Sequence, residues 1–245
     1  MVLFVGLPFL MLELDSEPSS TTVAVSASTT LATTSMSSTT IKATPTTTAA
    51  TGTTTAAQPF FQSSIGVIAP AEVSSSWREG CPLDVASLRA VDVSHFGYDG
   101  EVHSGRLVVA EEVAEDTVGI MSLLFEAGFP IERMEPVDAY GGDDNLSMAA
   151  NNTSAFNCRP VTGGSSWSEH SYGSAIDVNP LVNPYVMGAT VLPPEGAAYA
   201  DRTVEAPGMI HDGDLVVQAF AAHGWIWGGT WSSPQDYQHF STSGR

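Results

Sequence analysis

The part of this chain from about residue 59 to residue 245 predicts an α+β fold, with a small, mostly antiparallel sheet and helices packed to one side. Three observations lead to this class. Short apolar runs recur that are typical of strands, two longer segments carry apolar residues at helical spacing, and turn-forming residues separate them. We find no internal repeat. These roughly 185 residues are enough for one compact domain with a sizeable core.

The first strand and the first helix are predicted between residues 105 and 130. The run GRLVVA (105–110) is a candidate strand. In residues 111–127, apolar side chains recur at close to helical spacing, for example Val118, Met121 and Phe125. Gly128 is a suitable C-cap, and Pro130 stops the helix from continuing.

Shorter elements are predicted further along the chain. Residues 134–140 are a candidate second strand, followed by a loop over 141–154, and AIDVN (175–179) is a short strand. A helix through LVVQAFAAH (215–223) can be capped by Asp212 or Asp214 and is closed by Gly224. The runs WIW (225–227) and YQHF (237–240) are two further strands, joined by a loop that contains Gly and Pro.

The first 58 residues have a different composition. Residues 1–12, MVLFVGLPFLML, form an apolar run too short to span a bilayer as one helix, and we interpret them as a truncated signal or an anchor. Residues 13–58 are rich in Ser, Thr and Ala, so they cannot bury enough apolar surface to offset the entropy of ordering. We expect a disordered linker in an exported protein, extracellular or associated with the cell wall.

The chain is strongly acidic, with 27 Asp and Glu against 8 Lys and Arg and a net charge of −19. This charge argues against nucleic-acid binding and against attraction to anionic lipid. We therefore expect no nucleic-acid partner and no stable membrane domain, and we interpret the acidity as a source of solubility. Nothing in the sequence indicates an oligomer, so a monomer is expected.

The two cysteines fit an exported protein. A disulfide between Cys81 and Cys158 would tie down the start of the domain, and export favours it. Two unpaired, buried thiols are the alternative. Neither cysteine has a near partner of the C-x-x-C kind, so they are not a metal-binding pair.

The segment SEHSYGSAIDVNP (168–180) contains His170 and Asp177 with six residues between them. Gly173 interrupts a helix here, and Asp177 falls in a predicted strand, where its apolar neighbours would bury it. Burial is costly for a carboxylate unless it is paired or bound to a metal. Taken alone, the pair also fits a surface loop followed by an ordinary strand.

The segment WIWGGTWSSPQDYQHFS (225–241) adds His239 and, three residues earlier, Asp236. Two His, one Asp and an open fourth position are typical of catalytic zinc, and a nearby carboxylate can accept a proton from water. His170, Asp177 and His239 are therefore the candidate ligands, and Asp236 is the candidate base for hydrolysis of an amide bond. Residues three apart on a straight strand point to opposite faces, so Asp236 must lie in a bend after Pro234 to face the same site.

Arg159 and Ser168 complete the set of candidate site residues. Arg159 could stabilise an oxyanion or bind a substrate carboxylate, and its alternative role is a surface ion pair. Ser168 could hydrogen-bond the substrate or hold a metal ligand in place, and its alternative role is a loop-stabilising bond to the backbone.

Together these segments resemble the zinc-dependent D-alanyl-D-alanine carboxypeptidases, the VanY-like peptidoglycan peptidases. The family motif is S-x-H-x-x-G-x-A-x-D followed far downstream by D/E-x-x-H, and it is matched by Ser168, His170, Gly173, Ala175, Asp177, Asp236 and His239. The resemblance covers about residues 81–241. It implies zinc on the two His and Asp177, Asp236 as general base and Arg159 beside the tetrahedral intermediate. It also implies a small α+β zinc-peptidase fold with its site in a cleft, shared with lysostaphin-type enzymes and the hedgehog signalling domain.

The function that this resemblance implies is hydrolysis of peptidoglycan stem peptides by a secreted zinc metallopeptidase, as a D-alanyl-D-alanine carboxypeptidase. One alternative is an endopeptidase that cuts an L-alanyl-D-glutamate bond or a cross-bridge, because the motif does not distinguish the two. A second alternative is a wall-binding module that keeps the zinc but performs no catalysis.

Overall fold

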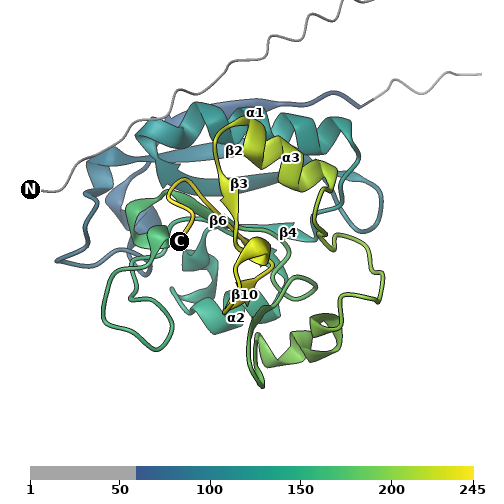
Figure 1. Ribbon diagram of the computed structural model, residues 1–245. Coiled ribbons are helices and arrows are strands. Elements are labelled where there is room, and N and C mark those ends of the chain that lie inside the picture. Colours follow the sequence, from purple (N-terminus) through teal and green to yellow (C-terminus); the bar gives the residue numbers. More distant parts are fainter. Residues whose placement is uncertain (1–58) are drawn as a thin grey trace, which may run out of the picture. The chain divides into compact units, whose positions relative to one another are not determined.

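The computed structural model describes residues 59–245 (Figure 1). The apolar segment 1–12 and the linker 13–58 lie outside these described residues. The helices are α1 (Ala114–Glu126), α2 (Asp144–Ala149) and α3 (Leu215–Ala222). The strands are β1 (Ser63–Val67), β2 (Leu88–Phe96), β3 (Val102–Ala110), β4 (Arg133–Met134), β5 (Asn152–Thr153), β6 (Ala175–Asp177), β7 (Tyr185–Met187), β8 (Thr190–Leu192), β9 (Ile226–Trp227), β10 (Gln235–Asp236) and β11 (His239–Ser241).

The longest strands, β2 and β3, form an antiparallel sheet with β1, and both faces of this pair are buried. Because side chains alternate along a strand, Val91, Val93 and Leu107 enter one apolar cluster while Ala90 and Val108 enter another. The first cluster includes α1, α3 and β11. The second includes Phe156 and Cys158. The sheet thus joins two layers of core.

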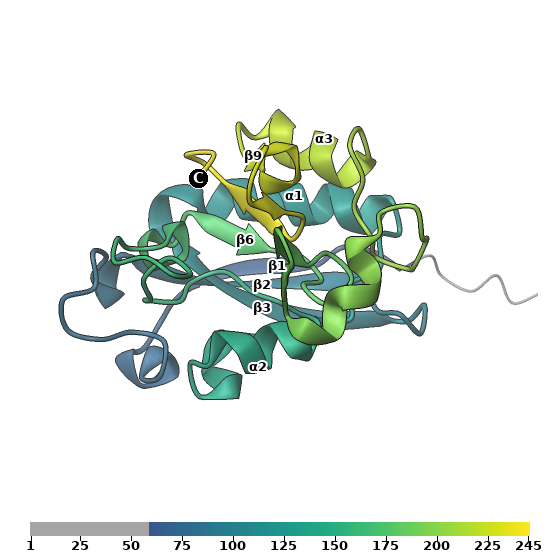
Figure 2. The ribbon, with the colours of Figure 1, turned by 60° about the horizontal axis from the view of Figure 1, so that its bottom comes forward.

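The α+β class is confirmed, but the helices do not all pack to one side. Figures 1 and 2 place α1 and α3 on one side of the β2–β3 sheet and α2 on the other. The segment 141–154, expected to be a loop, contains α2, which begins where the Asp143 carboxylate accepts hydrogen bonds from the backbone N–H groups of Asn145 and Leu146. Within the expected loop, Asp143 and Asp144 therefore mark the start of a helix.

The strand expected over 134–140 is wrong beyond its first residue. Only Arg133–Met134 forms β4, which pairs in parallel with β5, and Val137–Tyr140 forms a 3₁₀ turn. Pro136 has no backbone N–H and cannot continue a ladder of hydrogen bonds, which explains why the strand ends before it. The strand at 105–110 is confirmed as part of β3, and the helix over 111–127 as a 3₁₀ turn followed by α1.

The C-terminal half builds two further antiparallel sheets. The order β6–β11–β9 joins the strands expected at 175–179, 225–227 and 237–240, and the order β10–β7–β8 forms the second sheet. The expected helix over 215–223 is α3, whose N-cap position is Asp214, although the Asp214 side chain makes no capping hydrogen bond. Among residues 59–245, no helix is long and apolar enough to cross a membrane.

A disulfide joins Cys81 to Cys158, with their Cα atoms 5.9 Å apart. The expected pairing of the two cysteines is thus confirmed. It ties the segment before β2 to the residue that precedes Arg159.

Candidate active site

Two of the expected ligands lie directly opposite each other on neighbouring strands. Asp177 ends β6 and His239 begins β11, and the two residues are paired in the antiparallel register. Directly opposite residues in such a pair project to the same face of the sheet. The pairing therefore brings together a carboxylate and an imidazole that are 62 residues apart in the chain.

His170 reaches the same point from a 3₁₀ turn, Glu169–Tyr172, just before β6. The turn begins at Ser168, whose Oγ accepts a hydrogen bond from the His170 backbone N–H at 3.4 Å. It ends at Gly173, which has φ +65° and lies so close to β3 that a Cβ there would sit 2.5 Å from the Ala110 nitrogen. The motif glycine is thus required both by its backbone angle and by this close approach.

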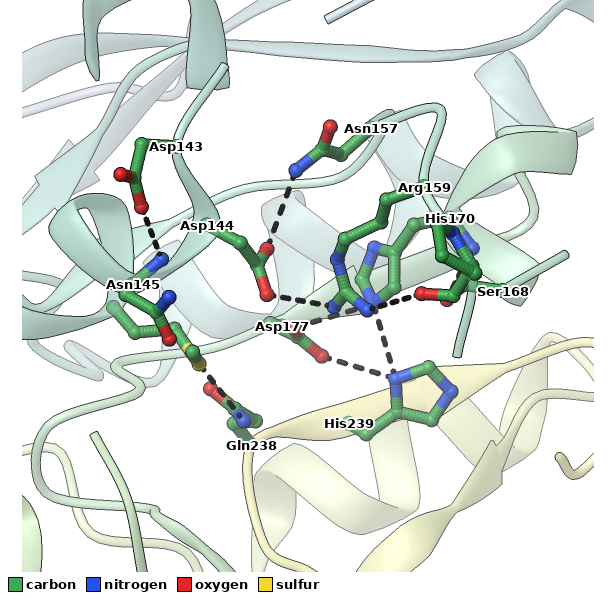
Figure 3. Close-up of polar contacts among 12 residues, drawn as sticks. Asp143, Asp144, Asn145, Asn157, Arg159, Ser168, His170, Asp177, Gln238 and His239 are labelled. Carbon is green, nitrogen blue, oxygen red and sulfur yellow. Dashed lines mark hydrogen bonds and ion pairs between the residues drawn. The ribbon is translucent and has the colours of Figure 1, made fainter. Parts of the chain in front are cut away.

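The side chains of His170, Asp177 and His239 converge, as Figure 3 shows. The His170 Nε2 atom lies 3.2 Å from both His239 Nδ1 and Asp177 Oδ2, and His239 Nδ1 lies 3.0 Å from Asp177 Oδ1. One ligand atom from each residue lies within 4.8 Å of the other two. All three residues are buried. Two nitrogens and one oxygen arranged in this way could hold a metal ion.

Main-chain oxygens fix the other nitrogen of each imidazole. His170 Nδ1 lies 2.6 Å from the Ala155 carbonyl oxygen, and His239 Nε2 lies 2.8 Å from the main-chain oxygen of Arg245. A ring nitrogen that donates to a carbonyl leaves the opposite nitrogen free as a ligand, the usual second layer of contacts around a metal-binding histidine. This arrangement orients His170 Nε2 and His239 Nδ1 toward their common point.

The three groups also shift one another's pKa values. Burial alone would raise the pKa of Asp177, but the charges and hydrogen bonds of the two histidines hold it well below its usual range. Burial alone would lower the pKa of His239, but the hydrogen bond and the charge of Asp177 raise it to about 9. The cluster therefore keeps its carboxylate ionised and binds a proton on His239 in the absence of metal.

Asp236 lies on a different strand from His239. It ends β10, paired with Tyr185 of β7, and the chain turns before β11 starts at His239. The bend that the sequence required is therefore the passage from one sheet to another. Gly228 makes this turn possible, because a Cβ there would lie 2.8 Å from the Asp236 carbonyl oxygen and 3.4 Å from the His239 Cβ.

The Asp236 carboxylate lines the same cleft as the three candidate ligands. Its Oδ1 atom is buried and has no hydrogen-bond partner among residues 59–245. Burial raises the pKa of Asp236 to about 6, with the charge of His239 acting in the opposite direction. A carboxyl group with such a pKa can both accept and release a proton near neutral pH.

Arg159 also lines the cleft, and its partner was not foreseen. One guanidinium nitrogen, Nη2, lies 2.9 Å from Asp144 Oδ2, while the Nε atom is buried without a partner among the described residues. Asp144 belongs to α2, in the segment expected to be a loop. No spacing pattern links these two residues, since they meet only through the fold.

The cleft has a volume of about 850 Å³, and its wall combines these polar groups with large apolar side chains. Tyr185, Met187 and Leu192 come from the β7–β8 hairpin. The Trp231 ring lies 5.6 Å from the His239 ring, between ring centres. Gln238 is a further cleft residue missed by sequence reasoning, although it stands between Asp236 and His239 in the chain.

Comparison with known protein families supports one assignment. The D-alanyl-D-alanine carboxypeptidase family matches residues 162–242. The expected resemblance is thus confirmed over a stretch that contains His170, Asp177, Asp236 and His239, but not Arg159. A peptidase is indicated. No curated protein and no solved structure matches the chain, so the specific fold that the resemblance implies stays a prediction.

Proposed function

We propose that this protein is a zinc-dependent peptidase that hydrolyses peptidoglycan stem peptides, as a D-alanyl-D-alanine carboxypeptidase. The observation that carries the proposal is the convergence of His170, Asp177 and His239 in one cleft with Asp236. The family match over 162–242 supplies the substrate class.

The donor set fits zinc. Neutral imidazole nitrogens and one carboxylate oxygen are ligands that zinc accepts, and three protein ligands leave a position open, as in catalytic sites. Both imidazoles already have their second nitrogen bonded to a main-chain oxygen, so His170 and His239 need no rearrangement to present the first. When bound, zinc supplies a Lewis acid that polarises a carbonyl and makes water more acidic.

The remaining polar groups of the cleft have separate roles in this proposal. Asp236 takes the proton of the attacking water on its unpaired Oδ1 and passes it to the leaving amine. Arg159 stabilises the negative charge that develops on the oxygen of the scissile carbonyl. Ser168 holds the His170 turn through its bond to the backbone, the structural role that the sequence had left as an alternative.

An endopeptidase that cuts an L-alanyl-D-glutamate bond or a cross-bridge is the second candidate. It is favoured by the pairing of Arg159 with Asp144, because this pairing partly neutralises the cation that would hold a free substrate carboxylate. Mass analysis of digested muropeptides separates the two candidates. Release of free D-alanine supports the carboxypeptidase, and a split stem supports the endopeptidase.

We also infer an exported, wall-associated, monomeric protein. The Cys81–Cys158 disulfide supports export, because disulfides persist in oxidising compartments. The net charge of −19 opposes nucleic acid as a partner. Cell fractionation and the mass of the purified protein in solution test the two inferences.

The function is tested by comparing two variants with the parent protein on muropeptides. We expect His170→Ala to lose both the metal and the activity. We expect Asp236→Ala to keep one zinc per chain and to lose about 10²- to 10⁴-fold in kcat. Equal activity of Asp236→Ala and the parent protein would refute the role of Asp236. A zinc-loaded parent without activity on sacculi and on soluble stem peptides would favour the non-catalytic wall-binding module.

A further inference from the structure

We propose that Asp144 is a positioning residue that holds the guanidinium of Arg159 in the cleft. This inference rests on the proposed function, because it concerns how Arg159 is presented to the reacting carbonyl. Asp144 lies on α2, outside the segment that matches the carboxypeptidase family, and it contacts none of the candidate metal ligands through a hydrogen bond or an ion pair in the described part of the chain.

The backbone of Arg159 is fixed to the turn that carries His170. Its N–H donates to Ser171 Oγ at 3.0 Å, and its carbonyl oxygen accepts from Ser171 Oγ at 2.8 Å and from the Ser168 N–H at 3.0 Å. These bonds place the Cα of Arg159 but leave the long side chain free. A side chain with this many rotatable bonds loses considerable entropy when it is held in one conformation.

Asp144 restrains the far end of that side chain. Its Oδ2 atom lies 2.9 Å from Arg159 Nη2, and both side chains are about one-fifth exposed, at 22% and 20%. The other contact of the guanidinium within the described residues is a hydrogen bond from Nη1 to the Pro160 carbonyl oxygen at 3.3 Å. Figure 3 shows Arg159 lying between Asp144 and His170.

Asp144 is itself held in place. It is the first residue of α2, directly after the capping residue Asp143, and its Oδ1 accepts a hydrogen bond from Asn157 Nδ2 at 3.3 Å. The Asn157 backbone N–H donates to the His170 carbonyl oxygen at 3.2 Å. One carboxylate oxygen of Asp144 thus serves Arg159, and the other is tied through Asn157 to the turn that carries His170.

The pairing has a kinetic consequence that a merely structural contact would not have. The bond from Nη2 to Asp144 holds the guanidinium in one orientation at the cleft wall, and its buried Nε–H has no partner among residues 59–245. A misplaced hydrogen-bond donor reduces stabilisation of the transition state more than it reduces the affinity for the substrate. Without the Asp144 charge, the positive charge of Arg159 would no longer be partly neutralised. If Asp144 acts only through charge, its loss should raise kcat; if it orients Arg159, its loss should lower kcat.

The experiment compares Asp144→Asn with Asp143→Asn in the zinc-loaded protein, using a stem pentapeptide that ends in D-alanyl-D-alanine. Both variants remove one negative charge, but only Asp144 contacts Arg159, and Asn caps a helix as well as Asp does. We expect Asp144→Asn to lower kcat by about 10- to 100-fold with KM changed by less than about twofold. We expect Asp143→Asn to match the parent protein, and both variants to keep one zinc per chain.

A second comparison uses Arg159→Met. If Asp144 acts through Arg159, adding Asp144→Asn to Arg159→Met causes no further loss, whereas independent effects would multiply. Unchanged or increased kcat in Asp144→Asn overturns the proposal, as does an equal loss in Asp143→Asn. In either case, if the parent protein is active on the stem peptide, the proposed function is not affected. A parent without release of D-alanine or cleavage of the stem overturns the proposed function, and this inference with it.

Discussion

The two sides of the cleft differ in how their buried polar atoms are paired. The residues that could bind a metal form what we call the paired side: the ring nitrogens of His170 and His239 and both oxygens of Asp177 have partners within residues 59–245. Other cleft residues form what we call the unpaired side: buried polar atoms of Arg159, Trp231, Asp236 and Gln238 have no partner there. An unpaired buried polar atom costs stability, and such atoms gather at sites that await another molecule. We interpret the paired side as organised for the metal and the unpaired side as organised for substrate and water.

The largest effect is expected from breaking the paired side. In the metal-free protein, Asp177→Ala leaves two buried imidazoles without their counter-charge, and we expect the free energy of unfolding to fall by about 3–5 kcal/mol. Urea denaturation at pH 7 in the presence of a chelator measures this. Asp84→Ala, at an exposed acid, is the control and should stay within about 0.5 kcal/mol. Equal losses in the two variants would show that the cluster is not a stabilising unit.

The second expected effect is the pH dependence of zinc binding. The pKa of His239 is raised to about 9 in the metal-free cluster, so zinc must displace a proton at any lower pH. We expect the affinity to rise about tenfold per pH unit between pH 7 and pH 9, and to level off above it. Competition with a chromophoric chelator measures the affinity, and calorimetry in two buffers measures the released proton. An affinity that stays constant over this range would contradict the paired state of His239.

A smaller effect of opposite sign is expected on the unpaired side. The pKa of Asp236 is raised to about 6, so ionisation of this carboxyl disfavours the folded state. This penalty is absent below the ordinary value near 4, grows with pH, and is complete above about 6. We therefore expect Asp236→Asn to stabilise the metal-free protein by about 1–2 kcal/mol at pH 8 and to leave it unchanged at pH 3.5. Urea denaturation of the variant and the parent protein at the two pH values measures this. The same difference in the free energy of unfolding at both values would argue against an unpaired Asp236.

The smallest effect is expected at Ser168. Its hydroxyl caps the His170 turn with a long hydrogen bond, so Ser168→Ala should cost about 0.5–1 kcal/mol of stability. If capping is its whole role, KM for the stem peptide stays within about twofold of the parent value. Thermal denaturation and steady-state kinetics on the same preparation check both statements. A large rise in KM would indicate that Ser168 contacts the substrate.

The sequence predicts the paired side better than the unpaired side, for a physical reason. His170, Gly173 and Asp177 stand close together in the chain, where local constraints of turn and strand decide which way they point. His239 could be named from its residue type and from the family resemblance, whereas its pairing with Asp177 depends on the register of β6 and β11. The three candidate ligands could therefore be named without a structure.

The unpaired side depends on long-range packing, which no local sequence pattern predicts. Asp144 meets Arg159 because α2 lies across the β2–β3 sheet from α1, and the segment that holds α2 was expected to be a loop. The strand β2 was also missed. Its polar residues mask the apolar alternation, yet one of them, Asp92, is paired with Arg106 directly opposite on β3, with side-chain atoms 2.6 Å and 2.9 Å apart. Such a pair becomes visible only when the register is known.

Because Asp177 and His239 pair across strands, the residues that could bind the metal and the residues that form the cleft wall come from different segments of the chain. The ligands are set by the register of β6 and β11, and the chain between them also includes β9, which pairs with the other edge of β11. The same connection supplies Tyr185, Met187, Leu192 and Trp231 to the cleft wall. Because closure entropy grows only slowly with loop length, the exposed turn of the β7–β8 hairpin, residues 187–190, can be lengthened or exchanged while the ligands stay in place. Designers seeking new substrate preferences on this scaffold can therefore vary this turn, which adjoins Met187 and Leu192 of the cleft wall.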